Sequence, residues 1–271
     1  MSLIYQKIAN FLIKKKVKFL NKIFFNIFKF FVKKKIILDF IDFKFYVYPN
    51  KKDLSIWMLR YLKIWDEPKI KLILDKIKKN EFIFIDVGCN YGAYSIPIAK
   101  KNKNLLVYSF DPSENALKKL KENILLNNIQ NINFYKVGIG EKNKKVYFDD
   151  NLSNFKNSGS YQIVKNKVGK EISVDSIDNL IIKKIILPKK NIFIKLDIEG
   201  YEFFALQGMV ETFKSYKVII FFEFSKKIFK NHYNFEIDFK KFIDQHYLKI
   251  FDKNMNRIQI DYLFKNIITI P

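Results

Sequence analysis

Short apolar runs alternate with amphipathic segments through the middle of the chain. FIFIDV at 82–87 and NIFIKLDI at 191–198 are nearly continuous in apolar residues, which is typical of strands buried on both faces of a parallel sheet. SENALKKLKENILLNN at 113–128 instead places its apolar residues at helical spacing. The alternation predicts an α/β fold in which helices cover both faces of a mostly parallel sheet.

The same pattern gives the expected order of elements. Strands are expected at 82–87, 105–111, 132–140, 191–198 and 217–225. Helices are expected at 70–79, 93–101, 113–128, 201–213 and 235–246. Residues 40–50 alternate and end in a turn, which predicts strands in a hairpin, and 247–251 and 257–260 predict closing strands.

The N-terminal segment has a different pattern and carries much of the charge. Residues 1–38 contain ten lysines and no acid, in a chain whose 50 basic and 27 acidic residues give a net charge of +23. Six of these lysines would form one stripe on a helix, with phenylalanines on the other side: Lys7, Lys14, Lys18, Lys22, Lys29 and Lys33 against Phe24, Phe28 and Phe31. Two interpretations stay open, a helix in an anionic membrane interface or a helix packed on the domain. A nucleic-acid arm is less favoured, because phosphate binding needs no apolar face.

Composition narrows the class of protein. Hydrophobic residues make up 49% of 271, enough for a sizeable core. The single cysteine, Cys89, excludes an internal disulfide and fits a reducing compartment, and two histidines are too few for a histidine-based metal cage. Because no linker rich in Pro, Gly or Ser is present, we expect a basic helical extension at 1–40 and a catalytic domain at 41–271.

The stretch DVGCNYG, residues 86–92, concentrates two of the eight glycines after a predicted strand. In open α/β sheets, ligands bind beyond the carboxyl ends of the strands. Gly88 and Gly92 permit a tight turn and close approach to a ligand, and Asn90 tolerates a left-handed conformation. Asp86, at the strand end, can accept hydrogen bonds from a cationic or hydroxylated ligand.

The next predicted strand ends in Asp111, which suits an acid that binds ribose hydroxyls. An alternative is that Asp111 caps the following helix, with Pro112 at its first position and Glu114 behind it. The spacing DxGxNxG lacks the third glycine of a dinucleotide site. S-adenosylmethionine carries no phosphate and tolerates an acid near its sulfonium, so the pattern favours the methyl donor.

Several motifs in order carry a family resemblance: FIFIDVGCNYGAYS, FDPSENALKKLKENILLN, VGIGEKNKKVYF, SVDSID and IKLDIEGYEFFALQGM. Over about residues 66–225 the chain resembles the FkbM family of S-adenosylmethionine-dependent methyltransferases. The resemblance implies a seven-stranded class I methyltransferase fold and methyl transfer to oxygen, often on sugars or natural products. It places Asp86, Gly88, Asn90, Gly92 and Asp111 on cofactor-binding positions, although the family usually has glutamate where Asp111 stands.

Methyl transfer to a hydroxyl needs alignment of the acceptor and a base to remove its proton. Asp197 in KLDIEG is the first candidate for that base, with Glu199 and Glu223 as supporting candidates. Alternatively, Asp197 and Glu223 share a divalent cation, although the sequence gives no strong metal signal. Glu202 is expected to stabilise the start of the next helix.

Other nucleophiles and functions are less favoured. His232 is more simply a surface residue than a base, and Cys89 a small packed residue. The expected acceptor is a small molecule, a sugar or lipid-linked glycan, handled in the cytoplasm with peripheral contact to the inner membrane face through 1–38. An RNA methyltransferase would suit the charge. However, enzymes that methylate amines carry the tetrapeptide [DN]PP[YF] at the fourth strand, and this chain has DIEG at that position. An inactive membrane-bound scaffold would have little need for DxGxNxG.

Overall fold

The computed structural model describes ten segments of the chain. They are residues 36–39, 42–47, 67–77, 81–149, 162–164, 169–189, 191–198, 200–222, 235–251 and 257–258. The basic stripe predicted for the first 38 residues and the site candidates Glu199, Glu223 and His232 lie outside them. Within the described segments, no helix is long and apolar enough to cross a membrane.

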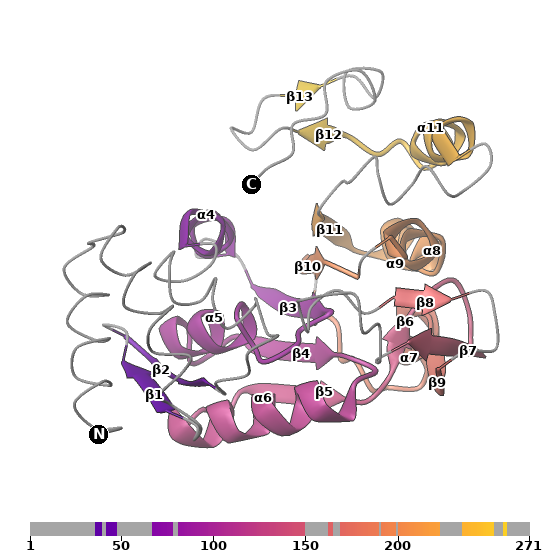
Figure 1. The fold of residues 1–271 in the computed structure, drawn as a ribbon. Helices are drawn as coiled ribbons and strands as arrows, with labels where there is room; N and C mark the ends of the chain where they lie inside the picture. The colour runs from indigo at the N-terminus through magenta and orange to yellow at the C-terminus, as the bar shows by residue number, and fades with distance from the viewer. Residues whose placement is uncertain are drawn as a thin grey trace, which may run out of the picture.

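A parallel five-stranded sheet forms the centre of the described structure (Figure 1). Its strands are β3 (Phe82–Val87), β4 (Leu106–Phe110), β5 (Ile132–Tyr135), β10 (Asn191–Leu196) and β11 (Lys217–Phe222). Their spatial order is β11-β10-β3-β4-β5, the 3-2-1-4-5 order of a doubly wound sheet. The predicted α/β fold with a parallel sheet is confirmed, and the count of seven strands stays a prediction.

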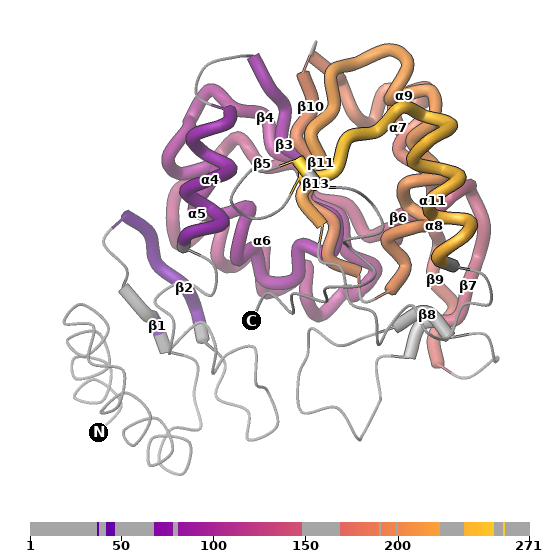
Figure 2. The backbone as a smooth tube through the Cα atoms, turned by 90° about the horizontal axis from the view of Figure 1, so that it is seen from above, coloured from indigo at the N-terminus to yellow at the C-terminus, as the bar shows by residue number. Residues whose placement is uncertain are grey.

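Helices cover both faces of this sheet (Figure 2). One face carries α4 (Glu67–Ile77), α5 (Ser95–Lys101) and α6 (Glu114–Leu126). The other face carries α7 (Ile177–Ile182), α8 (Glu202–Gln207), α9 (Val210–Ser215) and α11 (Phe235–Gln245). Alternate residues of β3 supply the two cores, because successive strand side chains point to opposite faces: Phe84 joins the first cluster and Ile85 the second.

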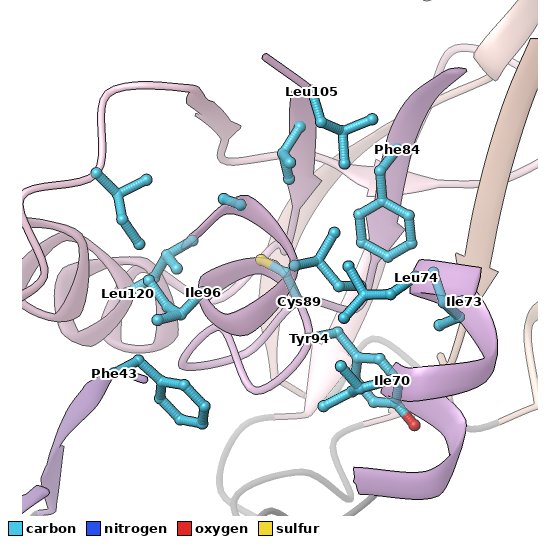
Figure 3. Packing of buried hydrophobic residues seen from close by; sticks show 14 of the residues in the cluster. Phe43, Ile70, Ile73, Leu74, Phe84, Cys89, Tyr94, Ile96, Leu105 and Leu120 are labelled. Carbon is cyan, nitrogen blue, oxygen red and sulfur yellow. The ribbon is translucent and has the colours of Figure 1, made fainter. Parts of the chain in front are cut away.

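Figure 3 shows part of the first cluster. Ile70 and Leu74 of α4 and Phe84 of β3 pack there, and Cys89 and Tyr94 lie in the same cluster. Cys89 is 3% exposed, so the prediction of a small packed residue is confirmed. Its burial, together with the nearby Asp111 carboxylate, raises the thiol pKa well above its usual value, which keeps it an unreactive thiol.

Smaller sheets surround the central one. The hairpin β1 (Ile36–Asp39) and β2 (Lys44–Val47) is antiparallel, as is the pair β12 (Ile250–Phe251) and β13 (Arg257–Ile258). A four-stranded sheet has the order β6-β9-β7-β8, from β6 (Gly138–Ile139), β7 (Lys144–Asp149), β8 (Gln162–Val164) and β9 (Lys170–Asp175). The strand predicted within 40–50 is confirmed at 44–47 and lies in a hairpin, but its partner strand, β1, lies upstream of residue 40. The turn predicted at 48–50 lies outside the described residues.

Two predicted elements are divided in the structure. The strand expected at 132–140 splits because β6 leaves the central sheet and pairs with β9. The helix expected at 201–213 becomes α8 and α9, which meet at Gly208. The Asp178 carboxylate accepts hydrogen bonds from the amides of Glu211 and Thr212, so a second helix start is capped there.

Candidate functional site

The candidate site lies at β3, the strand at which the order of strand addition reverses from one side of the sheet to the other. From β3 the chain winds outward to β4 and β5, and it later returns to pair β10 with the other side of β3. The loops that follow β3 and β10 therefore start side by side at the carboxyl edge of the sheet. This edge is where doubly wound folds bind ligands.

The loop after β3 is held in an unusual backbone conformation. Gly88, Asn90 and Gly92 have φ values of +75°, +48° and +90°, so the left-handed conformation predicted for Asn90 is confirmed. The amides of Gly88 and Cys89 both donate to the carbonyl of Phe110 at the end of β4, at 2.9 and 3.1 Å. These bonds tie the loop to the neighbouring strand.

Both glycines are also required by their protein neighbours. A Cβ at Gly88 would lie 2.0 Å from the carbonyl oxygen of Asp197, and one at Gly92 would lie 2.5 Å from Cδ1 of Leu120. The sequence predicts that these glycines permit a tight turn and the close approach of a ligand. In the structure, the close neighbour of Gly88 is instead the loop after β10.

Asp111 lies under this loop at the end of β4. Its two carboxylate oxygens accept from the amides of Asn90, at 3.0 Å, and Ser113, at 2.8 Å. Burial raises the pKa of Asp111 to about 6, against the lowering effect of these two amides. The alternative role as helix cap is wrong: Ser113 caps α6 by accepting from the amide of Ala116.

Asp86 is enclosed within the protein. It is 0% exposed, and its Oδ2 accepts from the amide and hydroxyl of Ser95, at 3.1 and 2.5 Å. The Ser95 hydroxyl also lies 2.8 Å from that of Ser109. Oδ1 of Asp86 has no hydrogen-bond partner among the described residues. Direct contact of Asp86 with a ligand stays a prediction, and the structure assigns it contacts beneath the loop.

Lys195, on β10, is a site residue that sequence reasoning missed. It is 3% exposed, and its Nζ donates to the carbonyl of Gly88 at 3.2 Å. The same ammonium lies 3.5 Å from Oδ1 of Asp86 and 3.3 Å from Oδ2 of Asp197. A signal was available, since Lys195 is the one charge inside the apolar run NIFIKL.

Asp197 is the accessible acid of the group. Its side chain is 31% exposed, and its amide donates to the carbonyl of Val87, 3.2 Å away. The structure thus brings Asp86, Asp197 and Lys195 together, with Asp111 on the far side of the glycine loop. The supporting candidates Glu199 and Glu223 stay predictions, because both lie outside the described residues.

Glu202 fixes the turn that follows Asp197. Its carboxylate oxygens accept from the amides of Ile198, at 3.0 Å, and Gly200, at 2.9 Å. The side chain is 3% exposed, and this burial raises its pKa to about 7. The prediction that Glu202 lies at the start of the helix is confirmed, and its hydrogen bonds stabilise the turn just before that helix. Among the described residues, no cluster of three or more His, Cys, Asp or Glu could hold a metal ion.

Comparison with known proteins gives one family. The model of the methyltransferase FkbM domain matches residues 86–266. A curated relative, the release factor glutamine methyltransferase of Fusobacterium nucleatum, is 32% identical over 115 residues. That match covers 42% of this chain and 32% of the relative, so the chain spans about a third of the relative's length.

Two solved structures are examples of the structural similarity. TYW2 of M. jannaschii in complex with AdoMet has 16% identity and a TM-score of 0.38, covering 81% of this chain and 76% of its own. The tRNA (uracil-54, C5)-methyltransferase of Pyrococcus abyssi, in complex with S-adenosyl-L-homocysteine, has 13% identity and a TM-score of 0.36. It covers 66% of this chain and 32% of its own.

Proposed function

Since this chain belongs to the FkbM family of S-adenosylmethionine-dependent methyltransferases, we propose that it transfers a methyl group to a hydroxyl oxygen of a small molecule. The observation that carries this proposal is the contact between Gly88 and the main chain of Asp197. It joins the loop predicted to bind the methyl donor to the loop that carries the predicted base. An enzyme that aligns donor and acceptor needs these two loops adjacent.

The residues around the first loop fit a nucleoside cofactor. Each carboxylate oxygen of Asp111 accepts a backbone hydrogen bond, from Asn90 or from Ser113, and retains a lone pair for a ribose hydroxyl. Oδ1 of Asn90 is buried and accepts no hydrogen bond from the described residues, which leaves it free to accept one from a ligand. When bound, S-adenosylmethionine supplies a methyl group already activated by its sulfonium. Gly88 and Gly92 keep the loop in the shape that presents these groups.

We assign the acceptor to the side of Asp197. Its carboxylate is partly exposed and oriented by Lys195, so it can take the proton of a hydroxyl within hydrogen-bond reach. In the chain, Glu199 follows β10 and Glu223 follows β11. Both are proposed to lie beside the acceptor. A divalent cation held between Asp197 and Glu223 is the alternative way to lower the pKa of the hydroxyl.

The proposed acceptor is a sugar, free or lipid-linked. The support is the family and the lysine stripe with opposed phenylalanines in 1–38, which fits an anionic membrane surface. We propose that the catalytic domain, 41–271, works in the cytoplasm, with the extension, 1–40, on the inner face of the membrane.

Calorimetric titration with S-adenosylhomocysteine tests the cofactor site. We expect micromolar binding to the wild type and at least about tenfold weaker binding to Asp111→Asn, because a charged acceptor is lost. Glu114→Gln, an exposed carboxylate three residues further on, is the matched control and should bind as the wild type does. Absence of binding to the folded wild type would contradict the methyltransferase assignment.

A methyl-transfer screen tests the acceptor. With labelled S-adenosylmethionine, we expect transfer to sugars or lipid-linked glycans and not to RNA. Asp197→Asn should lower the rate by about a hundredfold or more while S-adenosylhomocysteine still binds. Transfer to RNA that is as efficient as transfer to sugars, or more so, would overturn the proposed acceptor class. The net charge of +23 makes RNA the appropriate comparison.

A further inference from the structure

Lys195 is an ammonium group in a strand where every residue is buried. The six residues of β10 are all buried, and Lys195 itself is 3% exposed. Burying an ammonium ion is costly unless opposite charges and hydrogen bonds compensate for the lost water. A lysine at this position therefore needs partners that the fold provides.

The partners of Lys195 come from both loops of the site. Asp86 is its cross-strand neighbour in the register of β3 and β10, and Asp197 is two residues further along its own strand end. The third contact is the carbonyl of Gly88. One side chain thus touches the end of β3, the glycine loop and the predicted base. Its ammonium also lies 5.0 Å from the centre of the Tyr94 ring.

Neighbouring negative charges explain why Lys195 stays protonated although it is buried. Burial alone would lower the pKa of Lys195, but Asp197 and Asp86 outweigh it, so that pKa lies above the usual value. The two carboxylates bring two negative charges to one ammonium, and Asp111 adds a third negative charge across the loop. The site is therefore acidic overall, and Lys195 is a cation buried within it.

We propose that Lys195 is a positioning residue of the methyl-transfer site: its ammonium holds the glycine loop against Asp197 and balances the carboxylates around the cofactor position. This inference rests on the proposed function. It adds a second effect, because the positive charge of Lys195 acts on the Asp111 carboxylate across the loop. The groups that act on Asp111 by charge are Lys195 on β10 and Asp86 on β3, and the Cys89 thiol lies beside it.

The effect on Asp111 gives a readout that a purely structural lysine would not move. The pKa of Asp111 is raised to about 6 by burial, and Lys195 is among the groups that hold it down. Affinity for S-adenosylhomocysteine should fall in the wild type as the pH drops through about 6, because protonated Asp111 loses its charge. Without Lys195, the same fall should occur at higher pH.

The experiment is calorimetric titration of S-adenosylhomocysteine into the full chain between about pH 5 and pH 7.5. We expect Lys195→Met to shift the midpoint upward by about one pH unit, and Lys195→Arg to keep the wild-type midpoint at lower affinity. Lys119→Met is the matched control, since Lys119 donates to the hydroxyl of Tyr91 in the same loop, at 2.9 Å. That control should leave the midpoint unchanged.

A double variant covers the case in which Lys195→Met fails to fold. Asp86→Asn with Lys195→Met removes both charges of a buried pair, which proteins often tolerate. Because Asp86 and Lys195 act on Asp111 in opposite directions, the midpoint should lie close to that of the wild type.

Three outcomes separate the hypotheses. An equal loss of affinity at all pH values, with the midpoint fixed in Lys195→Met, would make Lys195 a structural residue and overturn the proposal. A midpoint in the double variant that lies about one pH unit or more above that of the wild type would also overturn it. No binding to the folded wild type at any pH would instead count against the proposed function.

Discussion

At Gly88 the main chain has a φ of +75°, and the space that a side chain would need is filled by the carbonyl oxygen of Asp197. We expect Gly88→Ala to lower the free energy of unfolding by at least about 2 kcal/mol, since backbone strain and a steric clash add. Urea unfolding measures the change. Gly138→Ala is the comparison, because Gly138 has no positive φ and a Cβ there would meet a side-chain methyl, Cγ2 of Val174 at 3.1 Å, before any backbone atom; equal losses would contradict the interpretation.

Glu202 makes stability depend on pH. Its folded-state pKa is about 7, against an ordinary value of 4.5, so between these values the folded chain holds a proton that the unfolded chain releases. Stability relative to Glu202→Gln should therefore fall as the pH rises from about 4.5 to about 7, by on the order of 3 kcal/mol. Unfolding of both proteins across this range measures the difference. A difference that is constant with pH would contradict the assignment.

At the residue scale, the sequence identified several positions but not their contacts. The left-handed conformation of Asn90 was predictable, because few residues other than glycine tolerate it. The capping role of Ser113 was missed, because Asp111 and Ser113 are both good caps and only the fold decides between them. Lys195 was missed because its partners lie on another strand, and register cannot be read from a single apolar run.

At the scale of elements, two asparagines attach the hairpin to the domain, one inside α6 and one that caps its carboxyl end. Oδ1 of Asn127 accepts from the amide of Lys44, at 2.7 Å, and Oδ1 of Asn123 accepts from that of Tyr46, at 2.8 Å. Asn127 also donates to the carbonyl of Lys44. Asn123 donates on its other side to the carbonyl of Tyr91 in the glycine loop. The helix thus offers β2 the hydrogen bonds that a further strand would have offered.

We expect Asn123→Ala to destabilise the protein by about 2 kcal/mol or more, because two buried backbone groups lose their partner. Hydrogen exchange at the amide of Tyr46 should become faster than in the wild type. Leu125→Ala lies on the same helix, is 66% exposed, and should change neither quantity. Unchanged exchange in Asn123→Ala would show that the hairpin does not depend on this contact.

Element types were predictable where the pattern was clear, as in the helical spacing of α6 and the continuous apolar run of β3. The limits of the predictions appear at 132–140 and 201–213, where one apolar pattern spans two elements. A continuous pattern cannot reveal that β6 changes sheets or that Asp178, more than 30 residues upstream, caps α9. The other strands of the four-stranded sheet, β7, β8 and β9, were not predicted, because β7 and β9 carry many charged residues.

At the scale of the whole molecule, residues 1–38 carry ten lysines and no acid, and so hold ten of the 23 net positive charges in about a seventh of the chain. We expect the full chain to bind vesicles with anionic lipid and not zwitterionic vesicles. Replacing Lys14, Lys18 and Lys22 by glutamine should weaken binding by about one order of magnitude or more. The control replaces three exposed lysines of the domain, Lys118, Lys121 and Lys142. Equal loss in both triple variants would indicate general charge attraction and contradict a membrane-binding helix.

The strand order also determines when the site can exist during synthesis. Gly88 and Lys195 are 107 positions apart in the chain, although β3 and β10 are neighbours in the sheet. Contacts between such distant positions form slowly, because a long loop has to close first. A ribosome must complete β10 before the glycine loop has anything to close against. A chain truncated before residue 191 would therefore keep its glycine motif intact in sequence and still lack a site.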